Sequence, residues 1–327
     1  MKAIGLLSGG LDSMLAVKLV LHQDIEVVGY HFASAFCTCH PNGCEKTSRR
    51  LSERLQIPVH LVRLDEEFLE MIRHQKFGFG HKMNPCIDCR IMTYRKAKTL
   101  MKETGASFIV TGEVLNQRPM SQFGHTLSQI EKESALEGLI VRPLSAQRLA
   151  PSIPEKMGWV DRSRFKDICG RRRTSQKILA QSLGLLDELK VTGGCRLTDS
   201  GFASRMKDLM TQEKWDLHDI QLLRIGRHFR ISPERKLILG RNEKENRRLK
   251  TFLTEGDTYL TPVSCPGPEG LIRGSVSDDR IAWCAGVIAK YAGSKTDMIL
   301  KITRDHRKEL LTVKALPEIN FKPYHIR

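Results

Sequence analysis

Residues 8–13 read SGGLDS, and this stretch decides the fold of the first part of the chain. An apolar run at residues 2–7 comes before it and predicts a buried strand, while residues 12–23 predict a helix. A glycine turn between a strand and a helix start exposes backbone N–H groups that can bind an anion. Glycine permits positive φ and close approach of phosphate, and the serine hydroxyls add donors. The stretch therefore predicts a phosphate-binding loop.

The loop lacks the features of two common nucleotide motifs. It has no Gly-Lys-Ser/Thr ending, which in a Walker A loop reaches the β- and γ-phosphates, and no G-x-G-x-x-G spacing. It resembles the PP-loop ATP pyrophosphatase signature S-G-G-x-D-S at every fixed position. PP-loop enzymes adenylate a carbonyl oxygen, and a nucleophile then displaces AMP. The resemblance implies ATP binding by Ser8, Gly9, Gly10, Asp12 and Ser13, with Asp12 orienting Mg²⁺ or the loop.

Strand-like and helix-like segments alternate up to about residue 145. Strands are expected at 2–7, 25–32, 59–64 and 107–113. This alternation indicates an α/β fold with a doubly wound parallel sheet. We expect a PP-loop domain (adenine nucleotide alpha hydrolase-like) at 1–150, a basic helical region that completes the active site at 151–219, and a smaller α+β domain at 220–327.

The composition points to a nucleic-acid partner. The formal net charge is +16, and a basic chain of this kind suits a polyanion. No apolar run is long enough to span a membrane, and the apolar start is too short for a signal peptide, so we expect a cytoplasmic protein with no membrane partner. Nine cysteines in such a protein suggest metal or sulfur chemistry rather than structural disulfides.

The block MNPCIDC, at residues 83–89, resembles the N-P-x-x-x-C-N segment of the MnmA-type tRNA 2-thiouridylases. That resemblance gives Cys89 the catalytic position and makes Cys195, after a glycine turn, its counterpart across the site. TGE at 111–113 falls on the family's T-G-H turn beside the nucleotide, which adds Gly112 to the ATP site. LIVRPLSA at 139–146 resembles the R-P-L segment of the ThiI 4-thiouridine synthetases, although no THUMP or rhodanese domain is recognisable.

Three cysteines, Cys86, Cys89 and Cys195, admit three interpretations. As thiolate ligands of a [4Fe–4S] cluster with an open iron site they would carry exogenous sulfide, as in several similar tRNA thiolases. Alternatively, Cys89 carries a persulfide and Cys195 resolves it, with Arg90 and Arg196 helping to lower the thiol pKa. A structural zinc site or inert buried thiols are the third interpretation. The first is favoured because Cys86 adds a thiolate where many relatives have aspartate.

CTCHPNGC at residues 37–44 has four potential metal ligands: Cys37, Cys39, His40 and Cys44. Zinc is disfavoured because the spacing matches no known ligand set. The loop could instead relay sulfur or close over the nucleotide.

Two basic clusters suggest RNA binding. Residues 162–177 include Arg171, Arg172 and Arg173, and residues 224–250 include Arg227, Arg230, Arg241, Arg247 and Arg248. Solvated helix faces would give the same composition. Residues 220–327 also resemble the NFACT-R domain of RNA-associated proteins, whose G-R-N-x-x-x-N-x-x-L pattern is matched by Gly240, Arg241, Asn242, Asn246 and Leu249.

Together these features predict an ATP-dependent tRNA uridine sulfurtransferase that releases AMP and pyrophosphate. The sulfur would come from sulfide, a cysteine desulfurase or a sulfur carrier. A PP-loop amidotransferase or lysidine-type ligase with a nitrogen nucleophile is one alternative, and a non-catalytic RNA-binding adaptor is another. The replaced uridine oxygen, O2 or O4, and the oligomeric state stay open.

Overall fold

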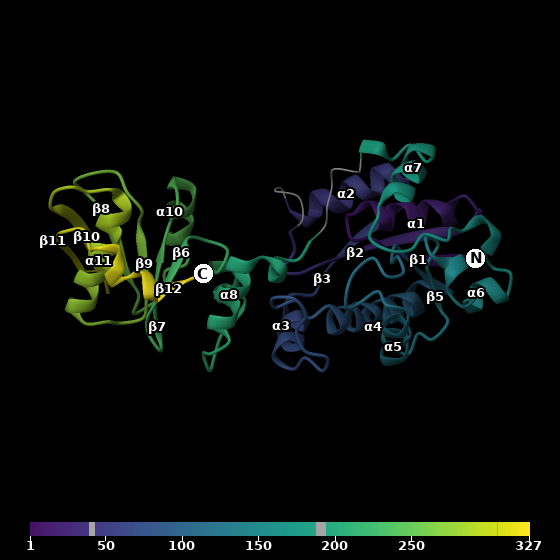
Figure 1. The fold of residues 1–327 in the computed structure, drawn as a ribbon, viewed down its shortest axis with the longest axis horizontal. Coiled ribbons are helices and arrows are strands. Elements are labelled where there is room, and N and C mark those ends of the chain that lie inside the picture. The colour runs from purple at the N-terminus through teal and green to yellow at the C-terminus, as the bar shows by residue number, and fades with distance from the viewer. Residues whose placement is uncertain (39–42, 188–193, 306) are drawn as a thin grey trace. The chain divides into compact units, whose positions relative to one another are not determined.

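Two sheets organise the chain, one parallel and one antiparallel (Figure 1). The computed structural model describes residues 1–38, 43–187, 194–305 and 307–327. They form two compact units, Met1–Thr198 and Asp199–Arg327, so the predicted region at 151–219 is divided between them and its boundaries stay predictions. Among the described residues, no helix combines the length and apolar character that a bilayer crossing requires.

The first unit contains a five-stranded parallel sheet in the order β3-β2-β1-β4-β5. This confirms the predicted doubly wound α/β fold, to which the structure adds a short fifth strand. The strands are β1 (Lys2–Leu6), β2 (Glu26–Ala33), β3 (Val59–Arg63), β4 (Phe108–Thr111) and β5 (Ile140–Val141).

Helices cover both faces of this sheet (Figure 1). Neighbouring residues on one strand, Ala3 and Ile4, are both fully buried but belong to opposite cores, as expected of a parallel sheet covered twice. One face packs against α1 (Leu11–Leu21), α2 (Cys44–Leu55) and α7 (Thr174–Ser182). On the other side lie α3 (Asp65–Arg73), α4 (Cys86–Thr104) and α5 (Gly124–Ser134).

The segment after β5 is less helical than its sequence suggests. It contains α6 (Ile153–Lys156) and the short 3₁₀ turns η1 (Ala146–Arg148), η2 (Arg162–Arg164) and η4 (Arg196–Thr198). In the basic stretch at 162–177, helix α7 begins only at Thr174, after Gly170, whose φ of 82° is not helical.

The second unit contains a seven-stranded sheet in the order β11-β10-β8-β9-β7-β6-β12, antiparallel throughout. Helix α11 packs on one face, and α9 and α10 pack on the other, which confirms the predicted smaller α+β domain. Its helices are α8 (Ser200–Leu209), α9 (Leu217–Leu222), α10 (Glu243–Lys250) and α11 (Asp278–Ala292). Its strands are β6 (Arg227–Ser232), β7 (Arg235–Leu239), β8 (Thr258–Pro262), β9 (Gly270–Arg273), β10 (Met298–Arg304), β11 (Arg307–Val313) and β12 (His325–Ile326), and the 3₁₀ turns η5 (Glu318–Asn320) and η6 (Lys322–Tyr324) come before β12.

Candidate active site

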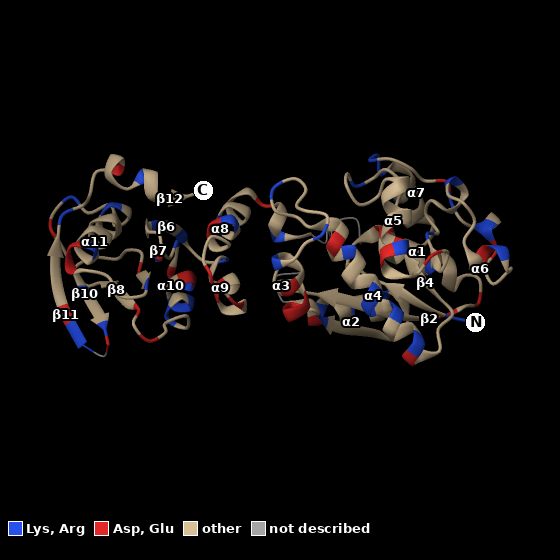
Figure 2. Cartoon of the chain, turned by 90° about the horizontal axis from the view of Figure 1, so that it is seen from below, with Lys and Arg blue, Asp and Glu red and all other residues tan. Residues whose placement is uncertain are grey.

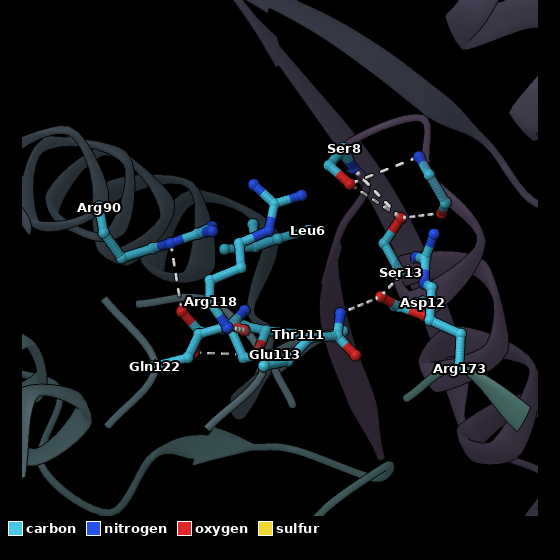
Figure 3. A pocket seen from close by; sticks show the side chains of 13 residues that line it. Leu6, Ser8, Asp12, Ser13, Arg90, Thr111, Glu113, Arg118, Gln122 and Arg173 are labelled. Carbon is cyan, nitrogen blue, oxygen red and sulfur yellow. Dashed lines mark hydrogen bonds and ion pairs between the residues drawn. The ribbon is translucent and has the colours of Figure 1, made fainter. Parts of the chain in front are cut away.

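A pocket lies at the carboxyl ends of β1 and β4, where the strand order reverses (Figure 3). Ligands of open α/β sheets bind in the crevice at this position. The predicted phosphate-binding loop, residues 8–13 and here called the phosphate loop, forms one wall of this pocket. The turn after β4 forms another. We call it the nucleotide pocket; its lining includes Ser8, Gly10, Asp12, Ser13, Arg90, Thr111, Gly112, Glu113, Gln117, Arg118, Gln122 and Arg173.

The phosphate loop is tightly folded on its own polar groups. Gly9 has a φ of 81°, a conformation that favours glycine. The Ser8 backbone N–H and hydroxyl both lie near the Ser13 hydroxyl oxygen, at 3.3 and 3.4 Å, and that hydroxyl donates to the Gly10 carbonyl at 2.8 Å. Figure 3 shows the two serines turned toward each other beside the pocket. The loop therefore presents both hydroxyls at the start of α1, where the helix dipole favours an anion.

Gly112 lets the turn after β4 contact the helix start. A Cβ atom at this position would lie 2.4 Å from the Ser13 nitrogen and 2.5 Å from the Asp12 carbonyl carbon. Real Cβ atoms do not approach backbone this closely, so any side chain here would push the two walls of the pocket apart.

Asp12 is held by two side chains. Its Oδ2 accepts hydrogen bonds from Gln117 Nε2 at 2.7 Å and from Arg173 Nη2 at 3.0 Å. Its Oδ1 is buried and has no hydrogen-bond partner among the described residues. An orphaned carboxylate oxygen beside a phosphate loop is what a bound Mg²⁺ would satisfy, so Asp12 fits that ion. The Arg173 contact could not be predicted from the sequence, which suggested an RNA-facing residue.

A buried carboxylate supports the pocket from behind. Glu113 is 2% exposed; its Oε2 accepts from Arg142 Nε at 2.9 Å and from the Tyr94 hydroxyl at 2.6 Å, and its Oε1 lies 3.2 Å from Arg90 Nε. Burial alone would raise the pKa of Glu113, but the Arg142 and Arg90 cations outweigh it and lower that pKa. The carboxylate therefore stays charged and fixes Arg90 at the pocket. The sequence signalled Glu113 only as the residue replacing the histidine of T-G-H.

A second pocket adjoins the first and contains three thiols. Cys37, Cys89 and Cys195 line it together with His31, whose Nδ1 lies 2.7 Å from the Leu7 carbonyl oxygen. We call it the thiol pocket. Ser8 and Arg118 line both pockets, so the phosphate loop and the thiols share a wall. The sequence analysis did not single out His31 or Arg118.

Two of the predicted cysteines begin helix α4. Cys86 and Cys89 are three residues apart in its first turn, so they lie on one side of the helix. Asn84 Nδ2 donates to the Cys86 sulfur at 3.0 Å. Burial raises the pKa of Cys89 to about 11 and outweighs the nearby Arg90 cation. Burial likewise raises the pKa of Cys195 to about 12, so the predicted lowering of these thiol pKa values by arginine is not seen.

Cys195 reaches the pocket through a short pairing with the segment after β2. Cys37 and Cys195 form an isolated antiparallel bridge. Across the described residues, no three His, Cys, Asp or Glu side chains are placed together so that they could hold a metal ion. The thiols are suitable cluster ligands by type, but their present placement does not form a cluster or zinc site. Two of the loop residues considered for zinc, Cys39 and His40, lie outside the described residues.

Arginines predicted to bind RNA occupy several environments. Arg171 and Arg172 are exposed. Arg230 pairs with Asp208 at 2.7 Å, and Arg241 pairs with Glu245 at 2.8 Å. The remaining three are Arg227, whose guanidinium lies 4.8 Å from the Tyr291 ring centroid, Arg247, which pairs with Glu243, and the exposed Arg248. Figure 2 shows acidic and basic residues interspersed on α10.

The G-R-N-x-x-x-N-x-x-L pattern of the second unit, at residues 240–249, serves the local fold. A Cβ at Gly240 would lie 2.0 Å from Asn246 Oδ1, so a larger residue there would have to displace the Asn246 side chain. Asn242 Oδ1 caps α10 by accepting from the Glu245 N–H at 3.0 Å, and Asn246 Oδ1 accepts from the Glu269 N–H at 3.2 Å. Leu249, the last residue of the pattern, is fully buried. These matches therefore explain local structure, and none of them by itself makes an RNA site.

Comparisons with known proteins match the two units to two different families. Residues 1–149 match the family model of the thiamine biosynthesis protein ThiI, and residues 226–325 match that of the NFACT protein RNA binding domain. The tRNA-specific 2-thiouridylase MnmA of Clostridium acetobutylicum is 32% identical over 121 residues, covering 32% of this chain and 34% of that protein. The probable tRNA sulfurtransferase of Thermococcus kodakarensis is 29% identical over 121 residues, covering 36% and 30%. The chain thus spans about a third of the length of these curated relatives.

Solved structures give weaker likenesses. A 4-thiouridine synthetase in complex with RNA and bound ATP aligns with 59% of this chain and 54% of its own, at 23% identity and a TM-score of 0.38. The C-terminal part of the fibronectin/fibrinogen-binding protein from Streptococcus suis aligns with 46% of this chain and 77% of its own, at 15% identity and a TM-score of 0.28. The predicted resemblances are confirmed as matches to these two family models, to ThiI over residues 1–149 and to the NFACT RNA binding domain over residues 226–325.

Proposed function

We propose that this chain is an enzyme that uses ATP to replace a carbonyl oxygen of a tRNA uridine with sulfur, giving 2-thiouridine or 4-thiouridine. One observation carries the proposal: the nucleotide pocket and the thiol pocket share Ser8 and Arg118. A uracil ring at this shared wall would have the α-phosphate on one side and a sulfur nucleophile on the other. Such proximity is what a two-step substitution requires.

In the first step the uracil carbonyl oxygen attacks the α-phosphate, and pyrophosphate leaves. The loop N–H groups and the hydroxyls of Ser8 and Ser13 would hold the phosphates. Arg118 and Arg173 place positive charge beside them. Mg²⁺, held through Asp12, would supply further charge for the leaving pyrophosphate. No lysine for the γ-phosphate is needed, because the bond that breaks joins the α- and β-phosphates.

In the second step sulfur attacks the activated ring carbon, and AMP leaves. The sulfur would be carried at the Cys86, Cys89 and Cys195 site, either as sulfide on a [4Fe–4S] cluster or as a persulfide. Iron and sulfide analysis of anaerobically purified protein tests the cluster, which requires about four of each per chain. Iron-free protein that forms thiouridine at full rate would establish the persulfide form.

The second unit would hold the tRNA. Its family model is that of an RNA-binding domain, and exposed arginines such as Arg248 suit phosphate contacts. Because the proposed substrate is tRNA, we place the enzyme in the cytoplasm.

The test is a direct assay with the full chain, ATP, Mg²⁺, a persulfide donor and unmodified tRNA, read by nucleoside mass spectrometry and pyrophosphate release. We expect thiouridine and pyrophosphate in equal amounts, and Cys195→Ala should abolish the thiouridine. Cys265→Ser, which changes a half-buried thiol in the second unit, is the control and should behave like wild type. Pyrophosphate release that survives Cys195→Ala with a nitrogen-containing product would establish the ligase alternative. Tight tRNA binding without any ATP turnover would establish the adaptor.

A further inference from the structure

Cys37 lies directly opposite Cys195 in a two-stranded contact. The Thr38 N–H donates to the Gly194 carbonyl at 3.0 Å, and the Arg196 N–H donates to the Phe36 carbonyl at 2.8 Å. These bonds flank the cysteines, so the cysteines form a non-hydrogen-bonded antiparallel pair, in which the Cα atoms are about 4.5 Å apart and the side chains are close. Disulfides span Cα separations of about 4.4–6.8 Å. The backbone therefore already holds the two thiols within bonding range.

Two local features maintain this pairing. A Cβ at Gly194 would lie 2.6 Å from Thr38 Oγ1, so glycine allows the two segments to approach. The Cys37 sulfur accepts a hydrogen bond from the Ser34 backbone N–H at 3.3 Å. A donor aimed at sulfur stabilises the thiolate, the form that attacks in thiol–disulfide exchange.

We propose that Cys37 is the thiol that releases sulfur from Cys195 during thiolation. This inference rests on the proposed function and on its persulfide form, but it places the persulfide on Cys195 and not on Cys89, which the sequence resemblance made the carrier. A sulfur-donor protein or a small persulfide would supply the sulfane sulfur as Cys195–S–SH. Its terminal sulfur attacks the adenylated ring carbon, the carbon–oxygen bond breaks, AMP leaves, and the proton goes to solvent. The product is a mixed disulfide, Cys195–S–S–C.

The Cys37 thiolate then attacks the Cys195 sulfur. The sulfur–sulfur bond to the base breaks, the electron pair leaves with the thiouridine sulfur, and a Cys37–Cys195 disulfide forms. A dithiol reductant restores both thiols for the next turnover. All electrons are accounted for, because the persulfide enters one oxidation level above a thiol and leaves that oxidation in the disulfide.

Cys89 is less suited to this step than Cys37. It lies in the first turn of helix α4, and among the described residues no backbone pairing joins it to Cys195. Cys37 faces Cys195 in register and has partial access to solvent, which a returning reductant needs.

Disulfide mapping tests the pairing without ATP or tRNA. The full chain is oxidised with oxidised glutathione, alkylated, digested without reduction and analysed by mass spectrometry. We expect a linked peptide containing Cys37 and Cys195. A Cys89–Cys195 link, or an alkylated Cys37 beside an oxidised Cys195, would overturn the proposal and leave the thiolation reaction itself untouched.

Turnover of Cys37→Ser tests the role. In a single-turnover assay with persulfide-loaded protein, ATP and tRNA, we expect released thiouridine to fall at least ten-fold while pyrophosphate release continues. The missing tRNA should be recovered as a covalent protein adduct that dithiothreitol releases, whereas Cys265→Ser should form no adduct. Wild-type thiouridine release from Cys37→Ser would contradict the role. Failure of the wild-type protein to release either product would instead contradict the proposed function, and the proposed role of Cys37 with it.

Discussion

Each unit contains a glycine motif followed by a helix, and the two motifs use their polar groups in opposite ways. In the first unit, Ser8 and Ser13 line a pocket and Asp12 has a buried oxygen without a partner among the described residues. In the second unit, Asn242 and Asn246 donate and accept within the fold. Buried polar groups are nearly always satisfied in proteins, so an orphaned one inside a pocket indicates a ligand. The first motif therefore marks a site, while the second marks a well-determined turn.

This contrast shows why two equally good motif matches carry different weight. The match in the second unit identifies a domain type, but the polar groups of its pattern serve helix capping and close packing within the fold. Any RNA contact there must come from exposed charge outside the pattern's glycine and asparagines. Substitutions made in pairs, one in each unit, test this contrast between the two motifs.

The largest effect is expected from Asp12→Asn. Asn keeps the size of Asp12 but loses the charge that holds Arg173 at 3.0 Å. Removing such a preorganised electrostatic contact costs roughly 100- to 1000-fold in rate, so pyrophosphate release should fall by that factor. The melting temperature should change little, because Asn can still accept from Gln117. Asp167→Asn, which breaks an exposed pair with Arg148, is the control. Wild-type pyrophosphate release from Asp12→Asn would show that this aspartate only starts the helix.

Paired glycine substitutions should separate the two motifs next. In Gly112→Ala the new Cβ meets the backbone of Ser13 and displaces the pocket wall, which should cost about 100-fold in pyrophosphate release. In Gly240→Ala the new Cβ meets Asn246, and overpacking of this kind costs roughly 1–3 kcal/mol of unfolding free energy. Its pyrophosphate release should stay normal. If Gly240→Ala lowered pyrophosphate release as much as Gly112→Ala, the assignment of one motif to chemistry and the other to folding would fail.

The buried carboxylate predicts an acid-sensitive first unit. The pKa of Glu113 is lowered in the fold, because Arg142 and Arg90 outweigh the effect of burial. Its stabilisation is therefore fully present above the unfolded pKa of about 4.3 and is lost as the pH falls through the lower folded value. Removing one partner of a buried pair costs about 3–5 kcal/mol, so Glu113→Gln should melt well below wild type at pH 7. Melting curves from pH 7 to pH 3 should show this gap closing in acid; a constant gap would exclude an ionised Glu113.

Much of the fold could be predicted, and much of the site could not. The alternation of strands and helices that starts at SGGLDS was enough to predict the parallel sheet, because parallel strands are joined by long crossovers that are usually helical. Cys37 beside Cys195 could not be predicted, since their pairing depends on two loops far apart along the chain. The Arg173 contact has the same explanation. The basic sequence around Arg173 suggested RNA binding, whereas the fold places its guanidinium 3.0 Å from Asp12. Tertiary contacts, and not local pattern, decide which charges are available to a ligand.

The smallest expected effect is on RNA affinity, and it distinguishes exposed from ion-paired arginines in the second unit. Arg248 is exposed on α10, whereas Arg230 is 21% exposed and donates to Asp208 at 2.9 and 2.7 Å. Each phosphate contact contributes about one unit to the slope of log affinity against log salt, so Arg248→Ala should weaken tRNA binding modestly and reduce that slope by about one. Arg230→Ala should instead lower the melting temperature and leave the slope unchanged, because it removes one of the two cations, with Lys236, that pair with the half-buried Asp208. Titrations of labelled tRNA at several salt concentrations measure both. An unchanged slope for Arg248→Ala with a reduced slope for Arg230→Ala would mean that RNA binding breaks the Arg230–Asp208 pair. The RNA-binding surface would then include β6 and not α10.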